Sequence, residues 1–228
     1  MNVLRKHFVA FIDILGFSGM VVDDCQAATT SHKNLDKLIE VHNATKARFG
    51  GETPYGLLQF SDSAIIAHPF EASRFRQFVE VVGGHQRQLL ERGLLCRGGI
   101  AYGWHYSAEG FVFSQGLIEA YHLESSVARY PRIVVSSDLL SILEYADDVD
   151  WGVPLMVEDD GAVFVDYMQG YATADTGDRV RELRDAHSKA PSAIREKILW
   201  LCNYYDYSAR KQADSLSSPR FRRFSRGT

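Results

Sequence analysis

Apolar residues along the chain change their spacing several times, and each change marks the boundary of a predicted element. Residues 7–15 are apolar at nearly every position, which indicates a strand covered on both faces. Residues 32–49 have apolar positions at helical spacing, and the sequence GGETP follows them. Residues 55–61 and 63–68 indicate the two strands of a hairpin, with Asp62 at its turn. This part of the chain therefore predicts the order strand, helix, strand, strand.

The alternation continues in the next segment of the chain. Residues 71–92 carry a second helical apolar stripe, and residues 94–106 (LLCRGGIAYGWHY) indicate a strand punctuated by glycines. Residues 114–130 predict a third helix, and residues 131–137 predict another strand. The order β-α-β-β-α-β is the split βαβ arrangement. We therefore expect an α+β, ferredoxin-like βαββαβ fold with extra strands and a C-terminal helical extension.

The remaining residues predict further elements and a change of character near residue 170. A short helix is expected over residues 137–145, and residues 155–168 predict a hairpin that turns at an Asp-Gly pair. Residues 172–178 (ATADTGD) have the composition of a linker, and residues 192–213 have helical spacing. The basic residues 215–228 are expected to be a mobile tail.

Composition narrows the class of protein. Of the 228 residues, 46% are hydrophobic and 24% are charged, and the net charge is −4. This balance indicates a globular protein and does not favour a nucleic-acid or membrane partner. The three cysteines, Cys25, Cys96 and Cys202, are odd in number and far apart, which favours the reducing cytoplasm. Because no apolar run approaches about 18 residues, we expect a cytoplasmic protein without a membrane span.

Two aspartates interrupt the apolar strands. Asp13 lies within the first strand, where an ionised carboxylate is costly unless it is paired or binds a metal. Asp62 lies between two serines at the hairpin turn. Alone, Asp13 is explained as a cap at a strand end and Asp62 as a turn residue. In a split βαβ fold, however, the first strand neighbours the hairpin, so the two acids can converge on hard cations suited to phosphoryl transfer.

Four segments in order resemble the motifs of class III nucleotidyl cyclases. FIDILGFSG resembles their first metal motif and QFSDSAII their second, RGGIAYG is similar to a glycine-containing strand, and residues 111–136 resemble the following helix and strand. The resemblance covers about residues 7–140. It implies a catalytic domain, residues 1–170, followed by the C-terminal helical extension and basic tail, residues 171–228. It also implies two divalent cations, Mn²⁺ or Mg²⁺, and a homodimer with active sites at the interface.

The resemblance implies roles for residues at the two metal motifs. Asp13 and Asp62 would be catalytic metal ligands, with the backbone carbonyl of Ile14 as a third ligand. Backbone amides of the turn that follows would hold the phosphates; these are the amides of Leu15, Gly16, Phe17 and Ser18.

The chain departs from the purine-specific family pattern at four positions. Leu58 stands where such members have Lys or Glu, Phe111 where they have Asp or Cys, Ile118 where they have Asn, and His122 where they have Arg. Because both metal-binding acids are kept while these positions change, the pattern suggests a substrate whose base is not a purine. The helix segment resembles that of the bacterial antiphage pyrimidine cyclases of the Pycsar type. The residues expected around base and ribose are Tyr55, Leu58, Arg97, Phe111, Glu119, Tyr121 and His122.

The predicted reaction is conversion of UTP, favoured over CTP, to the 3′,5′-cyclic monophosphate and pyrophosphate. Arg97, also expected to be catalytic, would favour uracil O4, whereas Glu119 would favour the cytosine amine. By analogy the product would signal in antiphage defence through a separate effector protein. Alternatives are an adenylate or guanylate cyclase, and a catalytically inactive nucleotide-binding or scaffold module.

Overall fold

The computed structural model describes residues 3–28, 32–48, 56–209 and 220–225. The elements are β1 (Arg5–Ile14), α1 (Phe17–Gln26), α2 (Lys33–Arg48), β2 (Gly56–Phe60), β3 (Ser63–Pro69), the 3-10 turn η1 (Ala72–Arg74), α3 (Phe75–Glu91), β4 (Cys96–Ala108), β5 (Phe111–Ser114), α4 (Gln115–Ser126), β6 (Ile133–Val135), α5 (Ser137–Glu144), β7 (Leu155–Glu158), β8 (Val163–Val165), α6 (Ala174–Ala186), α7 (Ser192–Ala209) and β9 (Phe221–Arg223). Among these helices, none combines the length and hydropathy of a membrane span.

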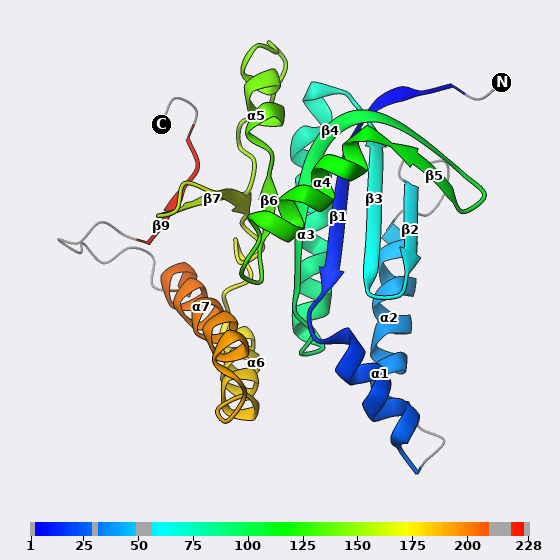
Figure 1. The fold of residues 1–228 in the computed structure, drawn as a ribbon. Helices are drawn as coiled ribbons and strands as arrows, with labels where there is room; N and C mark the ends of the chain where they lie inside the picture. The colour runs from blue at the N-terminus through cyan, green and yellow to red at the C-terminus, as the bar shows by residue number, and fades with distance from the viewer. Residues whose placement is uncertain (1–2, 29–31, 49–55, 210–219, 226–228) are drawn as a thin grey trace.

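The strands form one sheet in the order β2-β3-β1-β4-β6-β8-β7-β9, and β5 pairs with β4. The first four are antiparallel to one another, which is the strand arrangement of a ferredoxin-like core, and β6 pairs with β4 in parallel. The α+β, ferredoxin-like prediction is therefore confirmed. Figure 1 shows α4 crossing one face of this core while α3 lies behind it.

The two faces of β1 enter different cores because successive side chains of a strand point in opposite directions. Phe8 and Ile12 pack in the cluster that includes Phe78 of α3. Val9 and Phe11 pack in the smaller cluster on the α4 side. Asp13 continues the Val9–Phe11 series, so its carboxylate lies on the α4 side of the sheet.

Glycines allow α4 to pack directly on the backbone of β4. A Cβ atom added at Gly99 would lie 2.3 Å from the carbonyl oxygen of Ala120, and one at Gly103 would lie 2.5 Å from the amide nitrogen of Gly116. No side chain fits at these distances. This close packing places the C-terminal end of α4 over the end of β4 that carries Arg97.

The C-terminal region corrects two predictions. Residues 172–178 are not a linker, because α6 begins within them and the Thr173 side chain caps it by accepting from the Thr176 amide. Part of the predicted mobile tail is ordered, because Phe221–Arg223 form β9 and pair with β7. Residues 210–219 and 226–228 of this region lie outside the described residues.

A buried ion-pair network joins the C-terminal segment to the sheet. Arg132 is fully buried and pairs with Glu158, which also accepts a hydrogen bond from Trp200 Nε1 at 2.8 Å. The Arg220 guanidinium reaches the same carboxylate at 2.8 Å. Arg220 is therefore held against β7 by an ion pair with a buried acid. The basic composition of this segment predicted a mobile tail because it does not reveal that partner.

Candidate functional site

The aspartates of β1 and of the β2–β3 turn come to the same end of the sheet. Asp13 lies opposite Ser63 in the β1–β3 register. The Ile14 amide donates to the carbonyl of Asp62 at 2.9 Å. Ser61 has a φ of 52°, a left-handed conformation that is uncommon outside glycine, and it tightens the turn that carries Asp62. The predicted convergence of the two acids is thus supported by backbone contacts on both sides of the turn.

Arg97 lies between two acids at this end of the sheet. In the β1–β4 register it is opposite Asp13, and its Nε is 3.4 Å from Asp13 Oδ2. The same Nε is 2.6 Å from Glu124 Oε1 on α4. The Glu124 side chain is only 4% exposed, whereas that of Arg97 is 29% exposed. Arg97 therefore neutralises part of an acidic cluster formed by Asp13, Asp62 and Glu124.

Glu124 is a site residue that the sequence analysis did not single out. The signal was present, because Gly116, Ala120 and Glu124 repeat every four residues and are the buried positions of α4. An acid on the buried stripe of a helix needs a partner. The structure supplies that partner as Arg97.

Burial and mutual repulsion disfavour the charged forms of these acids. The pKa of Asp13 is raised by burial and by the charge of Asp62, against the opposing effect of Arg97. The pKa of Glu124 is raised by burial, with Arg97 opposing and both aspartates contributing in the same direction. One guanidinium thus leaves the cluster short of positive charge, which favours binding of a further cation.

The donor atoms at this end suit a hard cation. Asp13, Asp62 and the Ile14 carbonyl offer oxygen ligands, which Mg²⁺ and Mn²⁺ prefer. Among the described residues, no group of three or more His, Cys, Asp or Glu side chains is arranged to hold a metal. A cation here would take two carboxylates and the Ile14 carbonyl from the protein, and would complete its coordination with water or phosphate oxygens.

The backbone after β1 corrects one predicted phosphate contact. The Leu15 amide donates to the carbonyl of Leu95 at 2.8 Å, so it is already occupied. Gly16 has a φ of 80° and turns the chain into α1, a helix that the sequence did not predict. The Met20 amide makes the first helical bond, to the Gly16 carbonyl. The amides of Gly16, Phe17 and Ser18 precede that bond and keep the orientation that binds anions.

The predicted base and ribose residues on α4 are mostly exposed. Tyr121 is 50% exposed and packs edge-on against Phe11 with ring centroids 5.6 Å apart. Glu119 and His122 are also exposed, as is Ile118. Through Phe11, Tyr121 contacts the strand that carries Asp13.

Two other predicted base residues line a separate cavity. Leu58 and Phe111 belong to a cavity of about 160 Å³ between the β2–β3 hairpin and the β4–β5 hairpin. His105 also lines it, eight positions along β4 from Arg97, or about 26 Å at strand spacing. His105 is therefore well separated along β4 from the acid pair of one protomer, whereas Leu58 and Ile65 lie two strand positions from the residues that flank the turn of Asp62. Tyr55 lies outside the described residues.

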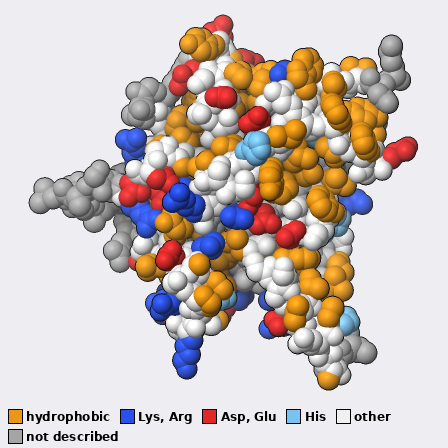
Figure 2. Space-filling view, viewed as in Figure 1, with side chains coloured by type: hydrophobic (Ala, Val, Ile, Leu, Met, Phe, Trp, Pro, Cys, Tyr) orange, Lys and Arg blue, Asp and Glu red, His pale blue; other side chains and the backbone are white. Residues whose placement is uncertain are grey.

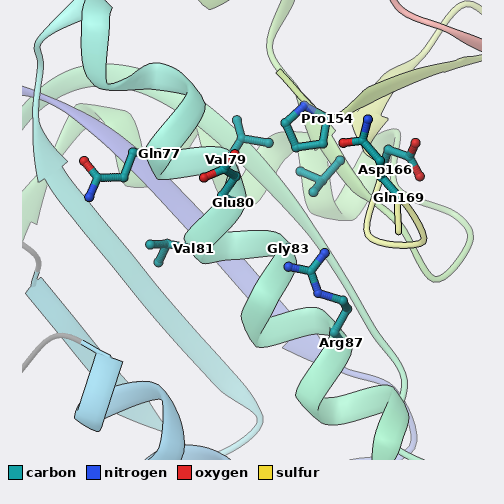
Figure 3. A pocket seen from close by; sticks show the side chains of 10 residues that line it. Gln77, Val79, Glu80, Val81, Gly83, Arg87, Pro154, Asp166 and Gln169 are labelled. Carbon is teal, nitrogen blue, oxygen red and sulfur yellow. The ribbon is translucent and has the colours of Figure 1, made fainter. Parts of the chain in front are cut away.

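Several other cavities are larger. One of about 390 Å³ is lined by Gln77, Arg87 and Asp166, and Figure 3 shows these side chains on α3 and beside β8. It is on the α3 side of the sheet, away from the acids. Another of about 580 Å³ lies between α1 and α2 and reaches Phe17 and Ser61.

Comparison with known proteins gives structural neighbours only. No protein-family model and no curated protein matches the chain. The adenylyl cyclase CyaB from P. aeruginosa has a TM-score of 0.49 and 15% identity, over 72% of this chain and 93% of that chain. The guanylyl cyclase Cya2 has a TM-score of 0.43 and 13% identity, over 72% and 91%. A class III adenylyl cyclase-like ATP-binding protein from Pseudomonas aeruginosa has a TM-score of 0.45 and 11% identity, over 59% and 34%.

Proposed function

We propose that this protein is a nucleotidyl cyclase that converts a pyrimidine nucleoside triphosphate, UTP in preference to CTP, to its 3′,5′-cyclic monophosphate and pyrophosphate. One observation carries the proposal. Asp13 and Asp62 lie at one end of the sheet, directly before the backbone amides at the start of α1 that would bind anions. Carboxylates for cations and amides for phosphates at a single place are what attack on a triphosphate requires.

Each residue has a part in this chemistry. Asp13, Asp62 and the Ile14 carbonyl would hold two divalent cations, Mg²⁺ or Mn²⁺. When bound, these would neutralise the triphosphate and promote loss of the 3′-hydroxyl proton. The amides of Gly16, Phe17 and Ser18 would hold phosphate oxygens. The 3′-oxygen then bonds to the α-phosphorus, the bond to the leaving pyrophosphate breaks, and the proton goes to solvent.

Arg97 has a positioning role in this proposal. Its guanidinium contacts both Asp13 and Glu124, so it fixes the orientation of the metal-binding acid. This differs from the expectation that Arg97 reads uracil, because its charge is already shared between two carboxylates. Preference for UTP over CTP therefore has to come from other residues.

A head-to-tail homodimer is part of the proposal. The base and the α-phosphorus of a nucleotide are only one ribose apart, whereas His105 and Arg97 are about 26 Å apart along β4. A nucleotide with its phosphates at the acids of one protomer therefore does not reach His105 of that protomer, although Leu58 and Ile65 at the other end of the cavity lie closer to those acids. A second copy would bring its cavity to the acids of the first.

Exposed apolar side chains along β2, β4, β5 and α4 support a partner at these elements. Six large side chains of β2, β4, β5 and α4 are between 47% and 62% exposed. They are Phe60, Trp104, Phe111, Phe113, Ile118 and Tyr121. Figure 2 shows hydrophobic side chains gathered over the β5 side of this face. Burial of such a patch favours association.

Incubation of the purified protein with UTP, CTP, ATP or GTP and Mn²⁺ tests the proposal. Separation of the products should give cyclic UMP as the main product, with cyclic CMP second. Asp13→Asn and Asp62→Asn should each abolish turnover in protein that remains folded. Purine turnover above pyrimidine turnover would make the protein an adenylate or guanylate cyclase instead.

A second candidate function is a catalytically inactive nucleotide-binding or scaffold module. The position of the Arg97 guanidinium beside Asp13 favours it, because a side-chain cation already lies where a metal would bind. Nucleotide binding without any turnover, unchanged by Asp13→Asn, would establish this function. A role in antiphage defence, with a separate effector that binds the cyclic product, belongs to the cyclase proposal alone.

A further inference from the structure

The cavity between the two hairpins contains a buried side chain without a partner. His105 is 2% exposed, and neither of its ring nitrogens has a hydrogen-bond partner among the described residues. The His7 ring packs on it with centroids 4.8 Å apart, and His7 is itself fixed by a contact between its Nδ1 and the Arg5 carbonyl. A buried polar group of this kind costs free energy unless something completes its hydrogen bonding.

The walls of the cavity suit a small aromatic heterocycle. Leu58 and Ile65 form an apolar side, Phe111 contributes an aromatic ring, and Ser107 adds a hydroxyl beside His105. The volume of about 160 Å³ is below that of a site for a whole drug-sized ligand, so it accommodates one fragment of a larger molecule.

Leu58 and Phe111, two of the residues expected around the base, line this cavity. We propose that His105 is a further specificity-determining residue, which hydrogen-bonds the edge of the base bound there. The inference rests on the proposed cyclase function and adds a residue that neither the motifs nor the expected base set contains. It also replaces the exposed Glu119 and His122 as readers of the base.

The protonation state of His105 suits recognition of an uncharged base. Burial, with the nearby His7 adding to it, lowers the pKa of His105 to about 4. The imidazole is then neutral at pH 7 and offers one N–H donor and one acceptor nitrogen. A base edge presents donors and acceptors of the same kind.

Steady-state kinetics with the four nucleoside triphosphates and Mn²⁺ tests His105. His105→Phe should lower kcat/KM for the preferred substrate about tenfold or more, and should lower it less for the others, because one hydrogen bond is lost only where the base used it. His105→Gln, which keeps a donor and an acceptor, should retain most of the preference. His68→Phe is the matched control, because His68 is a buried histidine of β3 on the opposite face of the sheet.

The outcome is decided by the ratio of kcat/KM for the preferred substrate to kcat/KM for each of the other triphosphates. A His105→Phe protein with the substrate preference of the wild type would overturn the proposal, whatever its absolute rates, because a structural role lowers all substrates alike. An equal change of preference in His68→Phe would also overturn it.

Failure of the proposed function is distinguishable from failure of this inference. If the wild-type protein cyclises none of the four substrates, the cyclase proposal fails and equilibrium dialysis with labelled UTP, CTP, ATP and GTP decides the role of His105. Base-selective binding that His105→Phe removes and His68→Phe keeps would support it. Equal binding by wild type and His105→Phe, or no binding by the wild type, would refute it.

Discussion

Replacement of Arg97 by methionine should destabilise the protein in a pH-dependent way. Methionine keeps an apolar stem but removes the charge that lies 2.6 Å from Glu124 and 3.4 Å from Asp13. Loss of one partner from a fully buried ion pair costs about 3–5 kcal/mol. Because the Arg97 side chain is 29% exposed and water can enter, we expect about 2–3 kcal/mol at pH 8.

The pH dependence follows from the direction of the pKa shifts. In the folded protein the pKa values of Asp13 and Glu124 are raised, so the stability that these groups contribute is fully present below their unfolded pKa values. It is lost as the pH rises through the folded values. Removal of Arg97 raises both folded values further. The cost of Arg97→Met should therefore be smaller at pH 4.5 than at pH 8, because the lower pH favours the protonated acids, which lose little when the guanidinium is removed.

Urea unfolding followed by tryptophan fluorescence at pH 4.5 and pH 8 measures this difference. Arg76→Met is the matched control, since Arg76 pairs with Glu80 and Asp150 while all three side chains are about half exposed. At pH 8, Arg76→Met should lower the free energy of unfolding much less than Arg97→Met does. Two results would refute the electrostatic account of the site. One is an equal decrease in the free energy of unfolding for the two variants, and the other is a decrease for Arg97→Met that is the same at both pH values.

Two further predictions concern packing. Glu158→Ala should lower the free energy of unfolding by about 3–5 kcal/mol because it leaves the buried Arg132 charge without its closest acid; a loss below 1 kcal/mol in urea unfolding would contradict this. Gly99→Ala should cost about 1–3 kcal/mol because its Cβ would lie 2.3 Å from the Ala120 carbonyl oxygen and displace α4. A melting temperature equal to that of the wild type would contradict the second prediction.

The core of the fold was predictable because its signals are local. The nearly continuous apolar run of β1, the hairpin turn at Asp62 and the helical stripe of α3 each identify an element, and their order selects a ferredoxin-like core. That topology sets β1 beside β3, so it also predicts the meeting of Asp13 and Asp62.

Elements that depend on distant contacts were not predictable from local pattern. Phe17, Met20 and Val21 give α1 a short apolar stripe toward α2, but the helix is only 10 residues long and none of its residues is buried, so its local signal is weak. The start of α6 has the composition of a loop, and its helical form is associated with packing of Gly177 against the Tyr205 ring, whose hydroxyl would lie 2.4 Å from an added Cβ.

The candidate site was predicted in part for the same physical reason. The meeting of Asp13 and Asp62 was predictable because their strands are neighbours in the sheet. The Arg97–Glu124 pair was not, because it depends on how α4 crosses the sheet. The cavity at Leu58, His105 and Phe111 depends on the approach of two hairpins far apart in sequence. Occupation of the Leu15 amide by Leu95 likewise depends on the position of β4.

The product formed from each nucleoside triphosphate in the presence of Mn²⁺ tests the central claim most directly. Wild-type protein and Asp13→Asn are compared at equal concentration, with circular dichroism to show that both are folded. The account predicts cyclic UMP and pyrophosphate from the wild type in equal amounts, and neither from Asp13→Asn. Folded, dimeric wild-type protein that leaves all four triphosphates intact, or equal turnover by Asp13→Asn, would contradict it.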